Sequence, residues 1–206
     1  MLLIDFGNTH ASIYDNKKIS KIKIEEFNPP KREFYYINVN PLLEKELENL
    51  PNSINLDRFI ILKTNYKGLG VDRKALCSFI DDGVVVDAGS AITIDIMENK
   101  VHKGGFIMQG ISSYYKSYEN ISISLKQERV QNSLHDIDKL PQTTREAIEF
   151  SIFKSIVLTI KDISKDKKIY FCGGDGLELS RYFKNSIFNQ ELMFDALKKI
   201  IKDIKC

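Results

Sequence analysis

Two short segments of the sequence place an acidic residue and a glycine together in what should be a tight turn. The first is Asp5-Phe6-Gly7-Asn8-Thr9 and the second is Asp87-Ala88-Gly89-Ser90-Ala91. A glycine in a turn lets the backbone approach a ligand closely, and its N–H can face an oxyanion. A carboxylate beside a phosphate makes sense only when a cation lies between the two. One such segment alone is typical of an ordinary β-turn, but two copies favour a site for nucleotide phosphates.

A third segment, Gly70-Val71-Asp72-Arg73, pairs a carboxylate with a guanidinium where a helix should begin. In one interpretation Asp72 caps the helix and Arg73 lies on a solvated face. In the other, Asp72 is a base for a hydroxyl nucleophile, and Arg73 makes a two-pronged contact with a substrate carboxylate. The residues of this segment alone leave both interpretations open.

A glycine cluster, Gly173-Gly174-Asp175-Gly176, follows an expected strand and precedes an expected helix. Such a turn suits an adenosine lying flat against the backbone. Other nucleotide motifs are missing from the sequence, which has no GxxxxGK[ST], while Gly68-Leu69-Gly70 is not continued as a dinucleotide fingerprint. The three histidines (His10, His102, His135) share no metal-ligand spacing, and we expect them to be surface residues or internally paired.

The elements that must position these segments form an internal repeat. Residues 2–13 can be laid over residues 84–95 with an offset of 82 positions, and each copy is an apolar run, an acidic turn and a second β-rich run. A strand-like piece follows each copy, at 19–27 and at 100–108. The repeat predicts two duplicated half-domains. Elsewhere we expect strands at 33–39, 58–62 and 168–172, and helices at 41–50, 72–80, 109–119, 144–163, 177–183 and 190–205.

Composition narrows the class of protein. The 206 residues are 43% hydrophobic and 28% charged, with a net charge of +2, which argues against a dedicated nucleic-acid binder. Three cysteines without a CxxC pair favour a reducing compartment. No apolar run approaches the roughly 20 residues of a membrane helix, and the opening Met1–Ile4 lacks a basic region before Asp5. We therefore expect a cytoplasmic globular protein with no membrane partner.

Taken together, six segments resemble, in order, the motifs of the type III pantothenate kinases, members of the actin-like ATPase superfamily. They are Asp5–Thr9 and Asp87–Thr93 (the phosphate motifs), Gly70–Arg73 (GxDR), Gly104–Gly110 (GGxIxPG), Thr144–Ile148 (TxxAI) and Gly173–Asp175 (the adenosine motif). The resemblance implies an α/β fold of two duplicated ribonuclease-H-like halves, residues 1–81 and 82–206, with a nucleotide cleft between them. Three positions depart from the family pattern, namely Ser90 for Thr, Gln109 for Pro and Cys172 for Thr.

The resemblance also implies an activity, the ATP-dependent phosphorylation of pantothenate to 4'-phosphopantothenate, the first step of coenzyme A biosynthesis. The residues that would bind ATP are Asp5, Phe6, Gly7, Asn8, Thr9, His10, Ala11, Ser12 and Ser90. Those that would hold pantothenate are Tyr66, Gly70, Val71, Asp72, Arg73 and Thr144.

Within this set the resemblance makes Asp72 the catalytic base and places Arg73 on the pantothenate carboxylate. Asp87 would bind a monovalent cation (K⁺ or NH₄⁺), and Mg²⁺ would accompany ATP. The family is a homodimer whose pantothenate pocket lies at the subunit interface, so we expect a homodimer.

Two other functions fit the same scaffold. One is a non-enzymatic nucleotide-binding regulator, as in the related Bvg accessory factor-type proteins. The other is a kinase for a different small hydroxylated acid, because Arg73 reads only a carboxylate. The intact Asp72–Arg73 pair favours a kinase over the regulator, since a protein that only binds has no need of a base.

Overall fold

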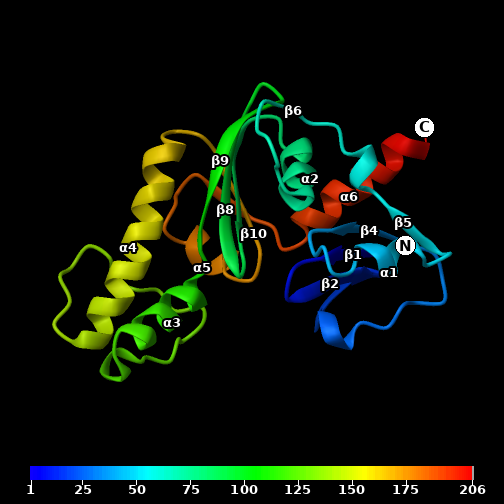
Figure 1. Ribbon diagram of the computed structural model, residues 1–206. Helices are drawn as coiled ribbons and strands as arrows, with labels where there is room; N and C mark the ends of the chain where they lie inside the picture. Colours follow the sequence, from blue (N-terminus) through cyan, green and yellow to red (C-terminus); the bar gives the residue numbers. More distant parts are fainter. Residues whose placement is uncertain (206) are drawn as a thin grey trace. The chain divides into compact units, whose positions relative to one another are not determined.

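The computed structural model describes residues 1–205, and these form two compact units (Figure 1). Cys206 lies outside the described residues. The first unit comprises residues 1–79 and 191–205, and the second comprises residues 80–190.

The elements of the first unit are strands β1 (Leu2–Phe6), β2 (His10–Asp15), β3 (Lys18–Lys23), β4 (Phe34–Asn38), β5 (Ser53–Asn55) and β6 (Lys63–Thr64), and helices α1 (Glu44–Glu48), α2 (Val71–Phe79) and α6 (Leu192–Lys205). Those of the second are β7 (Gly83–Ala88), β8 (Ala91–Glu98), β9 (Val101–Gln109), β10 (Ile169–Cys172) and β11 (Ser186–Phe188), with α3 (Ile111–Ile121), α4 (Thr144–Ser164) and α5 (Gly176–Ser180). Short 3₁₀ helices η1 (Ile24–Glu26) and η2 (Asp57–Phe59) lie in the first unit, and η3 (Ile123–Leu125) lies in the second.

The two units repeat one sheet topology. Strands β1 to β5 of the first lie in the order β3-β2-β1-β4-β5, and strands β7 to β11 of the second lie in the order β9-β8-β7-β10-β11. The central strand in each case, β1 or β7, is antiparallel to the next strand in the chain and parallel to the fourth. The predicted duplication and the mixed α/β fold class are confirmed.

The repeat is not perfect at its turns. Phe6 pairs with Ala11 across the first hairpin, whereas Ala88 pairs with Ile92 across the second. The first turn is therefore one residue longer than the second. Consequently the offset of 82 relates β1 to β7, but Ser12 and Thr93, the partners of the two acidic residues, differ by 81 positions.

Each unit has its own apolar core. In the second, alternate residues of β7 (Val84, Val86, Ala88) pack in one cluster with Ile152 and Ile156 of α4. Helix α4 begins at a capping box in which the Thr143 side chain accepts from the Glu146 N–H, an arrangement that satisfies otherwise unpaired amides of the first turn. The predicted helix 144–163 is thus confirmed within one residue.

The core of the first unit lies on one face of β1, where Leu2, Ile4 and Phe6 belong to a single cluster with Phe34 and Tyr36 of β4. The ring of Phe6 also meets Phe27 edge-on, with the ring centroids 4.8 Å apart. The apolar run before Asp5 is thus the buried centre of its sheet.

Two expectations differ from the structure. Of the strand expected at 58–62, residues 58 and 59 lie in η2 and residues 60–62 have no regular structure. The chain turns there because the Asn55 side chain accepts from the Asp57 N–H at 2.8 Å. The C-terminal helix, expected with residues 82–206, belongs to the first unit. There α6 packs on α2 (Figure 1). The centroid of the Phe194 ring lies 5.3 Å from that of the Tyr14 ring, and Lys198 Nζ lies 4.2 Å from the Tyr14 centroid.

Across residues 1–205, the helices are all too short or too polar to cross a membrane.

Candidate functional site

The first phosphate motif forms the turn at the carboxyl end of β1. Gly7 donates its N–H to the carbonyl oxygen of His10 at 3.0 Å. A Cβ on Gly7 would lie 3.1 Å from that same oxygen, so a side chain would crowd the turn. The Gly7 N–H, which we expected to face an oxyanion, is therefore used inside the turn. Asn8 and Thr9 are the exposed residues at its tip, so their amides are the donors best placed for an anion.

Neighbouring segments of the first unit hold this turn in place. The Asn8 carbonyl oxygen accepts from the Asn40 side chain at 3.4 Å, and the Thr9 carbonyl oxygen accepts from the Ile24 N–H at 3.2 Å. Phe6 and Ala11 are fully buried, so neither residue presents a surface to a ligand. The prediction assigned the phosphates to all eight residues Asp5–Ser12. In the structure, the exposed residues of this segment are Asn8 and Thr9, at the tip of the turn.

The second phosphate motif makes the corresponding turn after β7, closed by a hydrogen bond from the Gly89 N–H to the Ala91 carbonyl oxygen at 2.9 Å. Gly110, just before α3, donates its N–H to the Ser90 carbonyl oxygen at 3.2 Å. A Cβ on Gly110 would lie 2.4 Å from the carbonyl oxygens of both Gly89 and Ser90. Only glycine permits this approach. The start of α3 is thereby fixed against the turn that carries Ser90.

The glycine cluster after β10 packs on the end of β7. Gly173 has a φ of 81°, and a Cβ there would lie 2.4 Å from Asp87 Oδ1 and 2.5 Å from the Ala88 carbonyl oxygen. Asp175 donates its N–H to the same carbonyl at 2.9 Å. The structure therefore brings Asp87 and the Gly173–Asp175 turn together. A carboxylate beside main-chain carbonyls is a set of oxygen donors that suits a hard cation.

The GxDR segment forms the start of α2. Gly68 has a φ of 73°, and the next residue, Leu69, is buried and anchors the chain. The Gly70 carbonyl oxygen accepts from the Lys74 N–H at 3.0 Å, while Asp72 Oδ1 accepts from the Arg73 N–H at 2.7 Å. Asp72 thus lies in the first turn of α2 as both interpretations require, with one carboxylate oxygen bonded to the backbone.

Arg73 and Tyr66 are in contact. Arg73 is only 5% exposed, so the solvated face considered for it is wrong. Its guanidinium carbon lies 5.1 Å from the centroid of the Tyr66 ring, within the range of a cation–π interaction. The Tyr66 N–H donates to the Thr64 hydroxyl at 3.0 Å, which fixes the backbone before the ring. The structure therefore brings two predicted substrate residues together within the first unit.

Thr144 is the first residue of α4 and is exposed. Its neighbours Gln142 and Glu146 line a cavity of about 380 Å³ together with His135 and Glu149. Thr144 lies in the second unit, and the GxDR segment lies in the first.

One charged residue near the glycine turn had no signal in the sequence. The Arg129 side chain is only 9% exposed, and it meets Asp175 Oδ1 at 2.9 Å and Glu178 Oε2 at 2.5 Å. Arg129 lies between α3 and α4 in a stretch without a regular apolar repeat, so spacing could not have singled it out.

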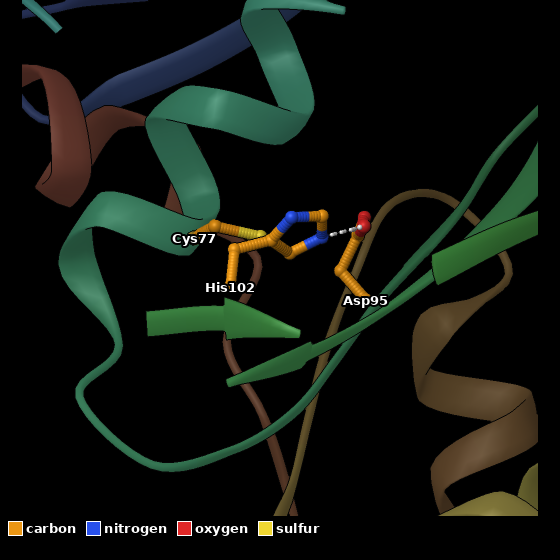
Figure 2. A group of neighbouring side chains, drawn as sticks. All are labelled: Cys77, Asp95 and His102. Carbon is orange, nitrogen blue, oxygen red and sulfur yellow. Dashed lines mark hydrogen bonds and ion pairs between the residues drawn. The ribbon is translucent and has the colours of Figure 1, made fainter. Parts of the chain in front are cut away.

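The buried histidine of the second unit is internally paired, as expected. Figure 2 shows the His102 ring and the Asp95 carboxylate joined across β8 and β9, with Nε2 2.8 Å from Oδ1. Both side chains are at least 98% buried. His135 is also paired, since its Nδ1 lies 3.2 Å from Glu149 Oε2.

Comparison with known proteins places these features in a family. A sequence model of the family described as type III pantothenate kinase matches residues 35–166. A protein from Campylobacter jejuni named type III pantothenate kinase is 48% identical over 205 residues, covering 98% of this chain and 97% of the relative.

Solved structures agree on the fold. A C. jejuni structure that carries the name of a Baf family transcriptional activator matches with a TM-score of 0.90 at 44% identity, covering 100% of this chain and 99% of that one. MreB5 of Spiroplasma citri bound to AMPPNP matches with a TM-score of 0.55 at 9% identity, over 99% of this chain and 96% of that one, which shows a shared fold. This chain belongs to the type III pantothenate kinase family.

Proposed function

We propose that this protein transfers the γ-phosphoryl group of ATP to the hydroxyl group of pantothenate, yielding 4'-phosphopantothenate and ADP, as the first step of coenzyme A biosynthesis in the cytoplasm. The observation that carries the proposal is the start of α2. There the Asp72 carboxylate accepts from the Arg73 backbone N–H, and the buried Arg73 guanidinium packs on the Tyr66 ring. Phosphorylation of a hydroxy acid requires a base that takes the hydroxyl proton and a cation that binds the carboxylate.

In the proposed reaction, the pantothenate hydroxyl oxygen forms a bond to the γ-phosphorus while the bond from that phosphorus to the β,γ-bridging oxygen breaks. Asp72 accepts the hydroxyl proton, and ADP leaves with the bridging oxygen. Arg73 pairs with the pantothenate carboxylate, and we also assign Tyr66, Gly70, Val71 and Thr144 to pantothenate binding. Because phosphoryl transfer depends on positioning, the rigid start of α2 suits this role.

ATP would be held by backbone donors and hydroxyl groups. We assign its phosphates to the segment Asp5–Ser12, with the amides of the exposed residues Asn8 and Thr9 as the main donors, and to the hydroxyl of Ser90. Adenosine is assigned to the turn Gly173–Asp175. Mg²⁺ bound with ATP would neutralise charge that develops on the phosphate oxygens. Asp87 would hold K⁺ or NH₄⁺, and the close packing of Gly173 on its carboxylate supports a role at the nucleotide.

We propose a homodimer as the active form. Several large apolar side chains between the end of α3 and the start of α4 are exposed, which is typical of a surface that another chain covers. They are Ile121, Ile123, Val130, Leu134 and Leu140. Sedimentation equilibrium of the full chain tests this state.

An ADP-release assay with Mg²⁺ and K⁺ tests the activity, comparing pantothenate with other hydroxy acids and with the alcohol analogue that lacks the carboxylate. We expect ADP release with pantothenate alone, and mass spectrometry should find one phosphate added to it. ATP binding without ADP release would instead support the nucleotide-binding regulator, a function suggested by the name of the C. jejuni structure. Release with another acid would identify a different kinase.

A further inference from the structure

Three segments of the second unit meet around the carboxyl end of β7. One is the Gly89–Ser90 turn, and another is the start of α3, which Gly110 attaches to that turn. The third is the Gly173–Asp175 turn, which rests on Ala88 through the Asp175 N–H. Backbone hydrogen bonds therefore hold all three segments at this end of β7. One side chain also links the start of α3 to the Gly173–Asp175 turn.

That side chain is Arg129. Its Nη1 lies 2.9 Å from Asp175 Oδ1, and the same atom donates to the Ser112 hydroxyl in α3 at 3.3 Å. Its Nη2 meets Glu178 of α5 at 2.5 Å. Arg129 thus links the first turn of α3 to the glycine turn and to the helix that follows it.

The burial of these groups makes the link stiff. The Glu178 side chain is 1% exposed, that of Arg129 is 9% exposed and that of Asp175 is 14% exposed. Charge-assisted hydrogen bonds in a poorly solvated position are stronger than those in water, and a planar guanidinium fixes the direction of each. Lysine offers one ammonium group and cannot bond all three partners in the same geometry.

We propose that Arg129 is a positioning residue for nucleotide binding, which holds the Gly173–Asp175 turn in register with the Ser90 side of the site by way of Asp175 and Ser112. This inference rests on the proposed function, which assigns adenosine to that turn. Arg129 itself bonds Asp175, Glu178 and Ser112, and it has no role at the reacting atoms. Its loss should weaken nucleotide binding and leave pantothenate binding unchanged.

The test compares Arg129→Lys with the wild-type protein. The lysine keeps a positive charge for the buried Glu178, so the fold should survive. We expect the Kd for AMPPNP by calorimetry and the KM for ATP to rise about 5- to 20-fold, with the KM for pantothenate within twofold and a melting temperature lower by a few degrees at most. Arg181→Lys is the matched control. Arg181, at the end of α5, donates to the carbonyl oxygen of Asn132, which lies three residues after Arg129, and this bond does not involve Asp175.

Asp175→Asn provides a second variant that leaves the Arg129–Glu178 pair in place. We expect the same loss of AMPPNP affinity, and no further loss in the double variant, since both changes break one link. Unchanged AMPPNP affinity in Arg129→Lys, an equal loss in Arg181→Lys, or additive losses in the double variant would overturn the inference. A wild-type protein that binds AMPPNP but releases no ADP would instead refute the proposed kinase activity, and the AMPPNP comparison would still decide the role of Arg129.

Discussion

Gly173 lies against Asp87 so closely that a Cβ on the glycine would come within 2.4 Å of the carboxylate oxygen Oδ1. The two residues reach this contact from neighbouring parallel strands, because Cys172 at the end of β10 pairs with Asp87 of β7. The glycine that follows β10 therefore turns directly over the carboxylate. The second phosphate motif and the glycine cluster, 86 residues apart in the sequence, are one local structure.

This contact predicts the effect of Gly173→Ala. The backbone there has a φ of 81°, which costs an L residue about 1–2 kcal/mol, and the new methyl group would displace Asp87. We expect a melting temperature lower by several degrees and a loss of ATP turnover. Gly174→Ala is the matched control for stability, because Gly174 has open space at its Cβ. Melting curves measured by circular dichroism test this prediction. Equal melting temperatures for the wild-type protein, Gly173→Ala and Gly174→Ala would contradict it.

Asp72→Asn tests the proposed base. The amide keeps the oxygen that accepts from the Arg73 N–H, so the start of α2 should be preserved, but it cannot take a proton from the substrate hydroxyl. We expect phosphopantothenate formation to fall at least 100-fold, while the Kd for AMPPNP changes less than twofold. Turnover equal to that of the wild-type protein would refute Asp72 as the base.

Much of the fold could be predicted because its signals are local. Uninterrupted apolar runs before Asp5 and Asp87 define the central strands, and apolar residues at helical spacing define α4 within one residue. Both acidic turns were found because glycine, Asp and Asn have strong backbone preferences. The duplication could be predicted because two copies of one local pattern strengthen each other.

The remaining features depend on contacts between distant residues. Nothing local indicates that α6 returns to the first unit, where it packs on α2. The Asn55 side chain overrides the apolar run at 58–62 by turning the chain. The role of Arg129 depends on partners 46 and 49 positions further along the sequence. Periodicity carries no information about such pairings.

The ring of Tyr66 should matter more than its hydroxyl, because the ring supports the Arg73 guanidinium at 5.1 Å. Tyr66→Phe keeps this support, and we expect a KM for pantothenate within twofold of the wild-type value. Tyr66→Leu removes it, and the KM should rise about 5- to 10-fold, the equivalent of about 1 kcal/mol, with little change in kcat. A large rise in Tyr66→Phe would show instead that the hydroxyl contacts the substrate.

Asp87 should make activity dependent on a monovalent cation. We expect turnover in K⁺ or NH₄⁺ buffers to exceed that in a sodium-only buffer at least tenfold, because K⁺ and NH₄⁺ are the ions that the resemblance to the family implies for Asp87. Asp87→Asn should lower turnover in K⁺ to the sodium level, since the charge that holds the ion is gone. Rates that are equal in the two buffers would remove the cation from the mechanism.

Asp57 should make the stability of the first unit depend on pH. Burial raises the pKa of this carboxyl from its ordinary value of 3.8 to about 6, although hydrogen bonds from Asn55 and Asn38 oppose the shift. A carboxyl whose pKa is higher in the folded state binds more protons there than in the unfolded state. The free energy of unfolding therefore falls as pH rises from about 4 to 6, and the loss is complete above that range. Because Asp57 is partly exposed, we expect this loss of unfolding free energy to be about 1–2 kcal/mol, less than the full pKa shift would give.

Asp57→Asn tests this pH dependence. The asparagine cannot ionise, so the melting temperature of this variant should match that of the wild-type protein near pH 4 and exceed it by several degrees near pH 7. Asp138→Asn, at a side chain that is 93% exposed, should leave the melting curve of the wild-type protein unchanged at both values. A constant difference between Asp57→Asn and wild type across this range would mean that Asp57 keeps one protonation state throughout.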